Sequence, residues 1–144
     1  MFDQIWFQPA SGDAGGSLGA ALAYWHHELK MPRLEFKDQM KGSYLGPKFE
    51  NDLIEKKLKS LKSNYKKYES SEIISLTAKE LANEKIVGWF QGRMEFGPRA
   101  LGGRSILGDP RSDKMQKNLN LKVKHRESFR PFAPSVLKED LSDW

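Results

Sequence analysis

The sequence contains no cysteine, which excludes both a disulfide framework and a thiolate metal site. It also lacks any apolar run approaching the roughly 20 residues that span a bilayer. The first residues, MFDQIWFQPASGD, carry no basic region ahead of an apolar core, so they do not indicate a secretory signal. We therefore expect a cytoplasmic protein with no membrane partner. The length of 144 residues suits about one domain.

Positive charge is concentrated in one part of the sequence. The formal net charge is +5, yet residues 85–131 hold eleven Lys+Arg against four Asp+Glu, an excess of seven. The planar fork of arginine binds phosphate or carboxylate through two parallel hydrogen bonds, which lysine cannot do. Six of the seven arginines lie in this window: Arg93, Arg99, Arg104, Arg111, Arg126 and Arg130. The window is therefore a candidate oxyanion site, with a merely solvated basic face as the alternative.

Residues 1–30 predict a strand, a glycine loop and a helix. The apolar run IWF at residues 5–7 is typical of a buried strand end. A turn-rich loop follows at residues 9–16, after which Ser17 is placed to cap a helix. Apolar residues then recur at spacings of four, three and four through Leu29, which predicts one face of a helix. Many α/β proteins use such a turn for packing alone, so the pattern by itself does not indicate a ligand.

The rest of the chain predicts alternating helices and strands around a small core. Residues 31–48 are expected to form a connector. A helix from Glu50 to Tyr65 carries an apolar stripe flanked by lysines, which is typical of a solvated helix face. The remaining expected elements are a helix at 75–83, strands at 85–90, 105–107 and 132–137, and a short helix at 112–118 capped by Ser112. The aromatic residues expected in the core are Trp89, Phe90 and Phe132.

The segment Gly92–Arg104 (GRMEFGPRALGGR) is the first candidate ligand-binding loop. Its four glycines let the backbone approach a ligand closely, and a proline fixes the backbone before the central arginine. The candidate binding residues of this loop are Arg93, Arg99 and Arg104. The alternative for each is a structural role, in which the guanidinium holds loop carbonyls or pairs with Glu95.

The segment Asn118–Pro134 (NLNLKVKHRESFRPFAP) is the second candidate ligand-binding loop. Its candidate binding residues are Lys124, Arg126 and Arg130. Glu127 lies between the two arginines, where it can orient one of them. We expect Lys124 and Arg130 to meet Arg99 around one polyphosphate.

Motifs for other chemistries are absent from the sequence. It has neither a GxxxxGK[ST] phosphate loop nor a GxGxxG fingerprint after a strand, so ATP would bind by another route. No Ser-His-Asp arrangement is evident, and His125 is a lone histidine for which a catalytic role is the minor alternative. His26 and His27 occupy adjacent helix positions, which cannot share a face as two metal ligands would.

Two long strings resemble the carbamoyltransferase family, which includes nodulation protein U and the enzymes that carbamoylate antibiotics. They are GWFQGRMEFGPRALGGRSILGDPR at residues 88–111 and NLKVKHRESFRPFAPSVL at residues 120–137. YLGP at residues 44–47 and QPASGDAGGSLGAAL at residues 8–22 also fit the family. The resemblance covers most of the chain and is long and specific in its C-terminal half.

This resemblance implies an α/β (α+β) fold in two parts. Residues 1–30 would be the tail of an actin-like ATPase-fold domain, and residues 31–41 a linker. Residues 42–144 would form an incomplete YrdC-like domain, a twisted mixed sheet with flanking helices. The chain would then be a piece of a longer protein, with the missing N-terminal part of the actin-like domain as its partner. Such a piece is expected to be inactive alone in full carbamoyl transfer.

The resemblance also implies ATP-dependent O-carbamoyl transfer. Carbamoyl phosphate would yield carbamate, the YrdC-like domain would join carbamate to ATP as carbamoyl adenylate, and the carbamoyl group would pass to a hydroxyl of a small-molecule acceptor. The catalytic positions that match are Arg99, Lys124 and Arg130, within a nucleotide-binding set completed by Arg93, Arg104 and Arg126. Asp13 matches a ligand of the family's metal, iron or another divalent ion, although from the residues alone it is a turn residue or helix cap.

Two other functions stay open at this point. A basic YrdC-like face with interleaved aromatics could bind RNA through phosphates, in which case affinity would fall steeply with salt and show no preference for ATP. Arginines held in glycine loops, rather than strung along one helix, make nucleic acid the weaker hypothesis. The third alternative is a noncatalytic remnant that folds and packs against a partner without binding a ligand.

Overall fold

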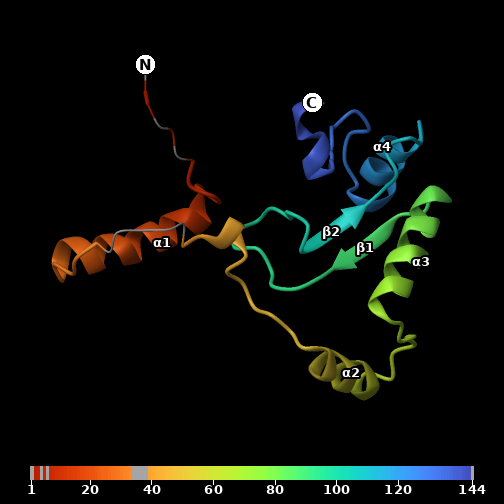
Figure 1. Ribbon diagram of the computed structural model, residues 1–144, viewed down its shortest axis with the longest axis horizontal. Helices are drawn as coiled ribbons and strands as arrows, with labels where there is room; N and C mark the ends of the chain where they lie inside the picture. Colours follow the sequence, from red (N-terminus) through yellow and green to blue (C-terminus); the bar gives the residue numbers. More distant parts are fainter. Residues whose placement is uncertain (1, 4, 6, 34–38, 144) are drawn as a thin grey trace. The chain divides into compact units, whose positions relative to one another are not determined.

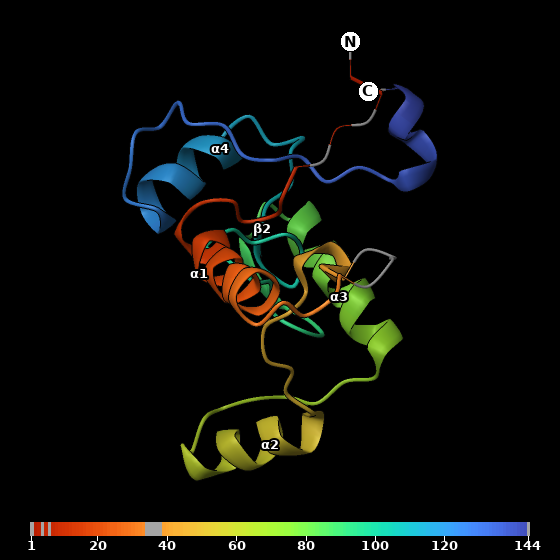
Figure 2. The ribbon, with the colours of Figure 1, turned by 90° about the vertical axis from the view of Figure 1, so that its left-hand side faces the viewer.

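The computed structural model describes residues 2–3, 5, 7–33 and 39–143, and it combines helices with a small sheet (Figure 1). The regular elements are α1 (Asp13–Ala23), α2 (Asn51–Ser60), α3 (Ser70–Ala82), β1 (Val87–Phe90), β2 (Arg104–Leu107) and α4 (Met115–Asn118). A π-helical turn, Tyr24–Glu28, extends α1, and another, Leu119–Val123, extends α4 (Figure 2). Short turns of 3-10 type lie at Lys41–Ser43 and Lys138–Asp143. The mixed α/β class is thus confirmed.

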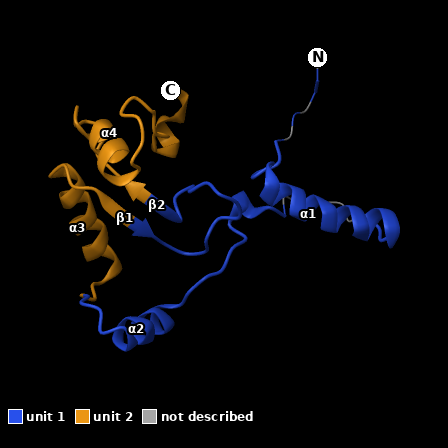
Figure 3. Cartoon of the chain, turned by 180° about the vertical axis from the view of Figure 1, so that it is seen from behind, with its two compact units in different colours: residues 1–65, 89–105 blue, residues 66–88, 106–144 orange. Residues whose placement is uncertain are grey.

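The chain forms two compact units, coloured separately in Figure 3. Unit 1 comprises residues 1–65 and 89–105, and unit 2 comprises residues 66–88 and 106–144. The candidate loop at 92–104 therefore belongs to unit 1, and the candidate loop at 118–134 belongs to unit 2.

The strands β1 and β2 pair as a two-stranded antiparallel sheet (Figure 1). Side-chain exposure alternates along β1, as expected for a strand with one covered face. The pairing continues past the strand end, because Gln91 N–H donates to the Gly103 carbonyl at 2.9 Å. The sheet thereby holds both ends of the glycine loop that joins its strands.

A second backbone ladder supports this loop within unit 1. Lys48 and Arg93 form an antiparallel bridge. Gly46 N–H donates to the Met94 carbonyl at 2.9 Å, and Met94 N–H donates to the Pro47 carbonyl at 3.0 Å. A Cβ on Gly46 would lie 2.9 Å from Met94 Cβ, so only glycine permits this approach. The YLGP segment is thus the backbone support of the glycine loop.

The core of unit 2 forms around α4. Met115 and Leu119 are 3% and 5% exposed, and with Met40 in unit 1 they are the buried hydrophobic residues of the described chain. Gly108 fits against this pair, since a Cβ there would lie 2.7 Å from Met115 Cγ. Helix α3 begins with a reciprocal capping box between Glu69 and Glu72. A small core was expected from the sequence, and the described residues have one.

The helices predicted from the sequence, and the strands predicted at residues 85–90 and 105–107, are confirmed with shifted boundaries. The helix predicted at 75–83 begins at Ser70, and the one predicted from Glu50 ends at Ser60, before Tyr65. Apolar spacing locates a helix better than its ends, because ends depend on caps and tertiary contacts. In the described chain, no helix is both long enough and apolar enough to cross a bilayer.

Two predicted strands are wrong. Ile5 and Phe7 are 69% and 84% exposed and lie outside any strand, while Trp6 falls outside the described residues. Residues 132–137 have no regular structure either. Both runs are apolar, but the described chain supplies no neighbouring strand to pair with them, and an unpaired strand has little stability.

Two predicted caps and two predicted core positions are also wrong. Helix α1 begins at Asp13 behind Gly12, and the Ser17 hydroxyl instead donates to the Ala14 carbonyl within the helix. Helix α4 begins at Met115, three residues after Ser112. The side chains of two aromatic residues expected in the core are exposed, Phe90 by 49% and Phe132 by 36%. Phe90 packs at a tilted angle on Phe49, and Phe132 lies under the Arg126 guanidinium.

Candidate functional site

The glycine loop of unit 1 is folded around the carboxylate of Glu95. Oε1 accepts hydrogen bonds from the backbone N–H groups of Leu101 and Gly103, both at 2.7 Å. Oε2 accepts from Arg104 Nε at 3.1 Å, and the Arg104 guanidinium also donates to the Gly97 carbonyl. The side chain of Glu95 has no exposed surface. One buried carboxylate thus closes the loop that carries Arg99.

These bonds determine the protonation state of Glu95. Burial alone would raise the pKa of the carboxyl group, but the hydrogen bonds from Leu101, Gly103 and Arg104 outweigh burial and lower the pKa to about 2. Glu95 is therefore ionised at neutral pH, and it neutralises Arg104. Arg104 therefore has the structural role that was the alternative for the arginines of this loop, because it pairs with Glu95.

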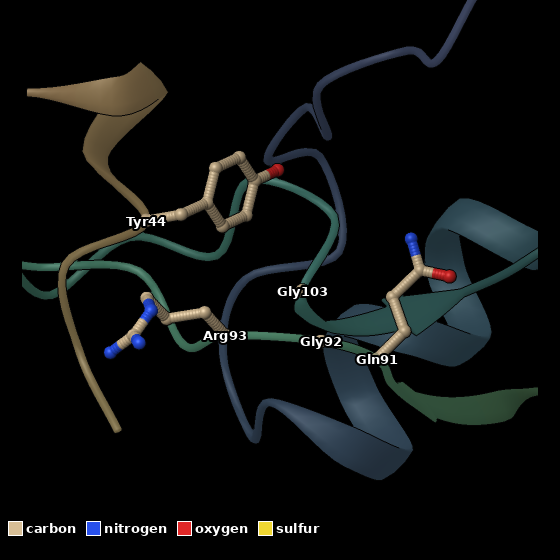
Figure 4. A pocket seen from close by; sticks show the side chains of 5 residues that line it. All are labelled: Tyr44, Gln91, Gly92, Arg93 and Gly103. Atoms are coloured by element: carbon tan, nitrogen blue, oxygen red, sulfur yellow. The ribbon is translucent and has the colours of Figure 1, made fainter. Parts of the chain in front are cut away.

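Arg93 is also engaged by the protein. Its Nη1 donates to the Gly46 carbonyl at 2.7 Å, and the Tyr44 hydroxyl donates to the Leu101 carbonyl at 2.5 Å. These two side chains line a shallow pocket of about 390 Å³ together with Gln91, Gly92 and Gly103. In Figure 4 the backbone at Gly103 lies between the Tyr44 ring and the Gln91 side chain. One donor of Arg93 is committed, and the others stay available to a ligand here.

A larger cavity of unit 1 brings together two predicted site residues. It measures about 660 Å³ and is lined by residues 10–14 and 97–99. Asp13 and Arg99 both line it. Helix α1 also begins at this cavity, because its first residues, Asp13 and Ala14, line the wall. Gly12, the residue before the helix, offers no side-chain cap to the first N–H groups. Its wall thus carries a carboxylate, a guanidinium and a helix N-terminus.

The turn before α1 and the loop at residues 97–99, which line this cavity, lie very close to each other. Gly97 has φ of 101°, and a Cβ there would lie 2.5 Å from the Ala10 Cβ. Ala10 itself has φ of 52°. The loop that carries Arg99 therefore needs glycine at position 97 both for its conformation and for its contact with the turn before α1.

Arg99 differs from the other arginines of its loop. It is exposed, and in the described chain its side chain has no hydrogen-bond or ion-pair partner. Its full set of donors is therefore available to an anion. Among the three arginines predicted in this loop, Arg99 is the one whose surroundings best suit ligand binding.

Asp13 by itself does not form a metal site. In the part of the chain that the structure describes, no three His, Cys, Asp or Glu side chains are grouped closely enough to hold a metal ion. A hard or borderline cation needs several oxygen or nitrogen ligands, and this chain offers one carboxylate at the cavity. The described residues therefore do not fit a complete metal centre.

The candidate loop of unit 2 holds the remaining predicted residues. Arg126 Nε donates to Asn120 Oδ1 at 2.7 Å, and the guanidinium lies 5.0 Å from the centre of the Phe132 ring. Arg130 pairs with Glu127 at 3.0 Å between exposed side chains, as the position of Glu127 predicted. Lys124 is exposed and has no side-chain partner in the described chain. Lys124 is therefore uncommitted, as is Lys122, which is also exposed and has no side-chain partner in the described chain.

The predicted site is thus divided between the two units. Arg93, Arg99, Arg104 and Asp13 belong to unit 1, while Lys124, Arg126 and Arg130 belong to unit 2. Each group is assembled by itself, and the meeting of Arg99 with Lys124 and Arg130 at one polyphosphate stays a prediction.

Two residues that build these loops were not predicted as site residues. Tyr44 had been included only within the YLGP string. Asn120 is wholly buried and contacts three residues of its loop. Position 120 does not lie on the helical apolar spacing that runs from Met115 to Leu119, so the sequence carried no clear signal for the burial of Asn120.

Comparisons with known proteins agree with the resemblance seen in the sequence. Residues 78–144 match the family model described as "Carbamoyltransferase C-terminus". The chain is 57% identical over 146 residues to an uncharacterized protein of Synechocystis sp., a match covering 99% of this chain and 24% of that protein. It is 45% identical over 145 residues to nodulation protein NolO of Bradyrhizobium diazoefficiens, covering 100% of this chain and 26% of that protein.

A further relative extends the same pattern. Nodulation protein NolNO of Sinorhizobium fredii is 42% identical over 147 residues, which cover 100% of this chain and 21% of that protein. The chain thus spans about a fifth to a quarter of the length of these relatives.

Proposed function

Because the chain belongs to the carbamoyltransferase family through its C-terminal domain at residues 78–144, we propose that it supplies the nucleotide-activating part of an ATP-dependent O-carbamoyltransferase. The observation that carries this proposal is the pair of cation-bearing loops, each built around a buried, hydrogen-bonded polar side chain and each presenting a cation whose side chain has no partner in the described chain. Arg99 is such a cation in unit 1, and Lys122 and Lys124 are such cations in unit 2; of the two lysines, the family resemblance points to Lys124.

The proposed chemistry has two steps after carbamoyl phosphate is hydrolysed to carbamate and phosphate. A carbamate oxygen attacks the α-phosphorus of ATP, the bond to the β-phosphate breaks, and carbamoyl adenylate and pyrophosphate form. A hydroxyl of the small-molecule acceptor then attacks the carbamoyl carbon, loses its proton, and AMP leaves. The chain's own residues would serve the first step by binding and orienting the phosphates.

The roles of the cations follow from charge. Negative charge develops on the phosphoryl oxygens in the adenylation transition state, and fixed cations stabilise it without reorganising. Arg99, Lys124 and Arg130 are the proposed catalytic residues. Arg93 and Arg126 keep free donors for the nucleotide, whereas Arg104 acts mainly by holding the loop. Asp13 would contribute one ligand to a metal centre completed by other parts of the longer protein.

The fold and the partner of this chain are also part of what we propose. We propose that the sheet of β1 and β2 is part of a YrdC-like domain and that residues 1–30 end an actin-like domain. Helix α1 and its π-helical turn bury no residue, and three apolar side chains on them, Leu22, Trp25 and Leu29, are 46%, 46% and 47% exposed. Such an apolar helix face suits packing against the rest of the actin-like domain. The proposed location is the cytoplasm.

The test is a calorimetric titration of ATP, with and without carbamoyl phosphate, into the parent chain and the variants Arg99→Ala and Lys124→Ala. Circular dichroism confirms folding of each protein. We expect each variant to bind ATP about tenfold or more weakly, because each loses a charge-assisted contact to phosphate. Arg111→Ala is the matched control: it also removes one positive charge, but its guanidinium is paired with Asp109.

The outcomes separate the alternatives. Equal weakening in Arg111→Ala would mean that net charge, rather than a built site, attracts ATP. Binding of RNA that falls steeply with salt, with no preference for ATP, would favour the nucleic-acid hypothesis. A folded parent that binds no ATP would overturn nucleotide binding by this chain.

A further inference from the structure

Asn120 is a wholly buried polar residue whose side chain is fully hydrogen-bonded. Its exposed fraction is 0%. Oδ1 accepts from Arg126 Nε at 2.7 Å, and Nδ2 donates to the carbonyls of Ser128 at 3.1 Å and Arg130 at 2.8 Å. The backbone carbonyl of Asn120 also accepts from Arg126 N–H at 3.0 Å. One residue thus contacts the chain at three points between positions 126 and 130.

These bonds tie the two ends of the cation loop together. Lys124 leaves the π-helical turn with its N–H bonded to the Leu119 carbonyl at 2.9 Å. The next residue, His125, has φ of 48°, a left-handed conformation that does not continue the helix. Residues 128–130 of the loop are then held at the carbonyls of Ser128 and Arg130 by the Asn120 amide. No other side chain in the described chain bonds both of these carbonyls.

The Gln116 amide also binds the backbone of residues 129 and 130, through longer hydrogen bonds than the Asn120 amide makes to Arg130. Gln116, one helical turn earlier, donates from Nε2 to the carbonyls of Phe129 at 3.2 Å and Arg130 at 3.1 Å, and its side chain is exposed. The carbonyl of Arg130 thus receives two side-chain donors from α4 and its extension. Such convergence on one carbonyl fixes the backbone from which the Arg130 guanidinium extends.

From this geometry we infer that Asn120 is a positioning residue that sets the spacing between Lys124 and Arg130 for binding two linked phosphoryl groups. The inference rests on the proposed function, in which these cations hold a polyphosphate. Asn120 touches no phosphate itself. Its amide acts through the backbone of residues 128–130, and its Oδ1 acts through Arg126.

The side-chain chemistry explains why asparagine is required. Two donors and one acceptor are used at once, and only an amide supplies both on so short a side chain. Aspartate has the same shape, but one of its carboxylate oxygens would face the two carbonyl oxygens that the Asn120 amide now binds. Alanine would leave the Ser128 carbonyl and the Arg126 guanidinium without this side-chain partner.

The test compares pyrophosphate with inorganic phosphate, using the intact chain and calorimetry. Pyrophosphate can engage both cations, whereas phosphate is short enough to be satisfied by one. In Asn120→Ala and Asn120→Asp we expect the affinity for pyrophosphate to fall about tenfold, while the affinity for phosphate changes by less than about twofold. The two variants should therefore show a smaller preference for pyrophosphate over phosphate than the parent does.

Two controls separate positioning from general damage. Leu119→Ala removes a core side chain beside Asn120 and is expected to lower Tm without changing the ratio of the two affinities. Asn118→Ala removes an amide from the same helix that has no partner in the described chain, and it should change neither Tm nor the ratio. If Asn120→Ala does not fold, Gln116→Ala, whose side chain is exposed, should show a smaller drop in the same ratio.

Each outcome decides a specific point. A parent that binds neither anion overturns the proposed function, and this inference with it. A parent that prefers pyrophosphate, together with a folded Asn120→Ala that keeps that preference, overturns the inference alone. Equal weakening for both anions in the folded variant also overturns it, because positioning predicts a selective loss.

Discussion

Glu95 and Arg104 form an ion pair in which the Glu95 side chain has no exposed surface and the Arg104 side chain is 30% exposed, with Nε 3.1 Å from Oε2. The pair lies inside the glycine loop, and the carboxylate also binds the N–H groups of Leu101 and Gly103. A buried carboxylate with this many donors is stabilised in its charged form. The positive charge of Arg104 is thus used to build the loop, and Arg99 is left to face the cavity.

The first prediction concerns the stability of the protein in acid. The pKa of Glu95 is about 2 in the folded chain, below its ordinary value of 4.5. A carboxyl whose pKa is lowered by folding stabilises the protein above its unfolded pKa, and this stabilisation is lost as pH falls toward the folded pKa. We therefore expect the free energy of unfolding to decrease as pH falls from about 4.5 to about 2. Urea titrations at a series of pH values measure it.

The matched variant for this prediction is Glu95→Gln. Its amide keeps an acceptor for the backbone N–H groups but loses the charge that neutralises Arg104. At pH 7 the variant should be less stable than the parent, and the difference should narrow as pH approaches 2. A difference that stays constant with pH would show that Glu95 acts by shape alone.

The second prediction concerns Gly97. Its φ of 101° strains any residue with a Cβ, and that Cβ would clash with Ala10 at 2.5 Å. Gly97→Ala should lower stability by roughly 1–3 kcal/mol. The control is Gly19→Ala in the interior of α1, where nothing lies within 4 Å of the added methyl group. That change should raise stability by about 0.5–1 kcal/mol, since alanine favours helix. Chemical denaturation of both variants distinguishes them, and equal effects would contradict the geometry.

Elements with local causes could be predicted from the sequence. Helix α2 follows from apolar spacing, and β1 and β2 follow from short β-branched and aromatic runs bounded by glycine. The runs at 5–7 and 132–137 have similar composition, yet the described residues among them form no strand. A strand needs a partner, and composition does not say whether one is present.

The candidate site, too, could be predicted from the sequence only in part. The sequence predicts which cations bind an anion, because arginines among glycines are chemically distinctive. It could not assign their roles, since Arg104 and Arg99 have similar local sequence. The difference arises from Glu95, which accepts from Arg104 and not from Arg99. Contacts across several residues of a folded loop decide such roles, and residue type alone does not.

The third prediction concerns Asp109 and Arg111. Arg111 donates through its side chain and its backbone N–H to the Asp109 carboxylate, and these bonds lower the pKa of Asp109 to about 2. In Arg111→Ala the side-chain bonds are lost while the backbone bond is kept. The pKa of Asp109 should therefore rise toward its ordinary value of 3.8 without reaching it. Carboxyl carbon shifts in an NMR titration measure this change, and an unshifted Asp109 would mean that the pair does not persist in solution.

The last prediction concerns Ser43, which is 1% exposed and has φ of 72°. Its hydroxyl is buried without a hydrogen-bond partner in the described chain. Because an unsatisfied buried polar group costs free energy, Ser43→Ala should raise stability by about 1 kcal/mol. The opposite sign is expected for Ser105→Ala, since the Ser105 hydroxyl accepts from Gly102 N–H at 3.1 Å. Thermal denaturation of the two variants tests this contrast. A loss of stability in Ser43→Ala would mean that its hydroxyl is hydrogen-bonded in solution, for example to a buried water molecule.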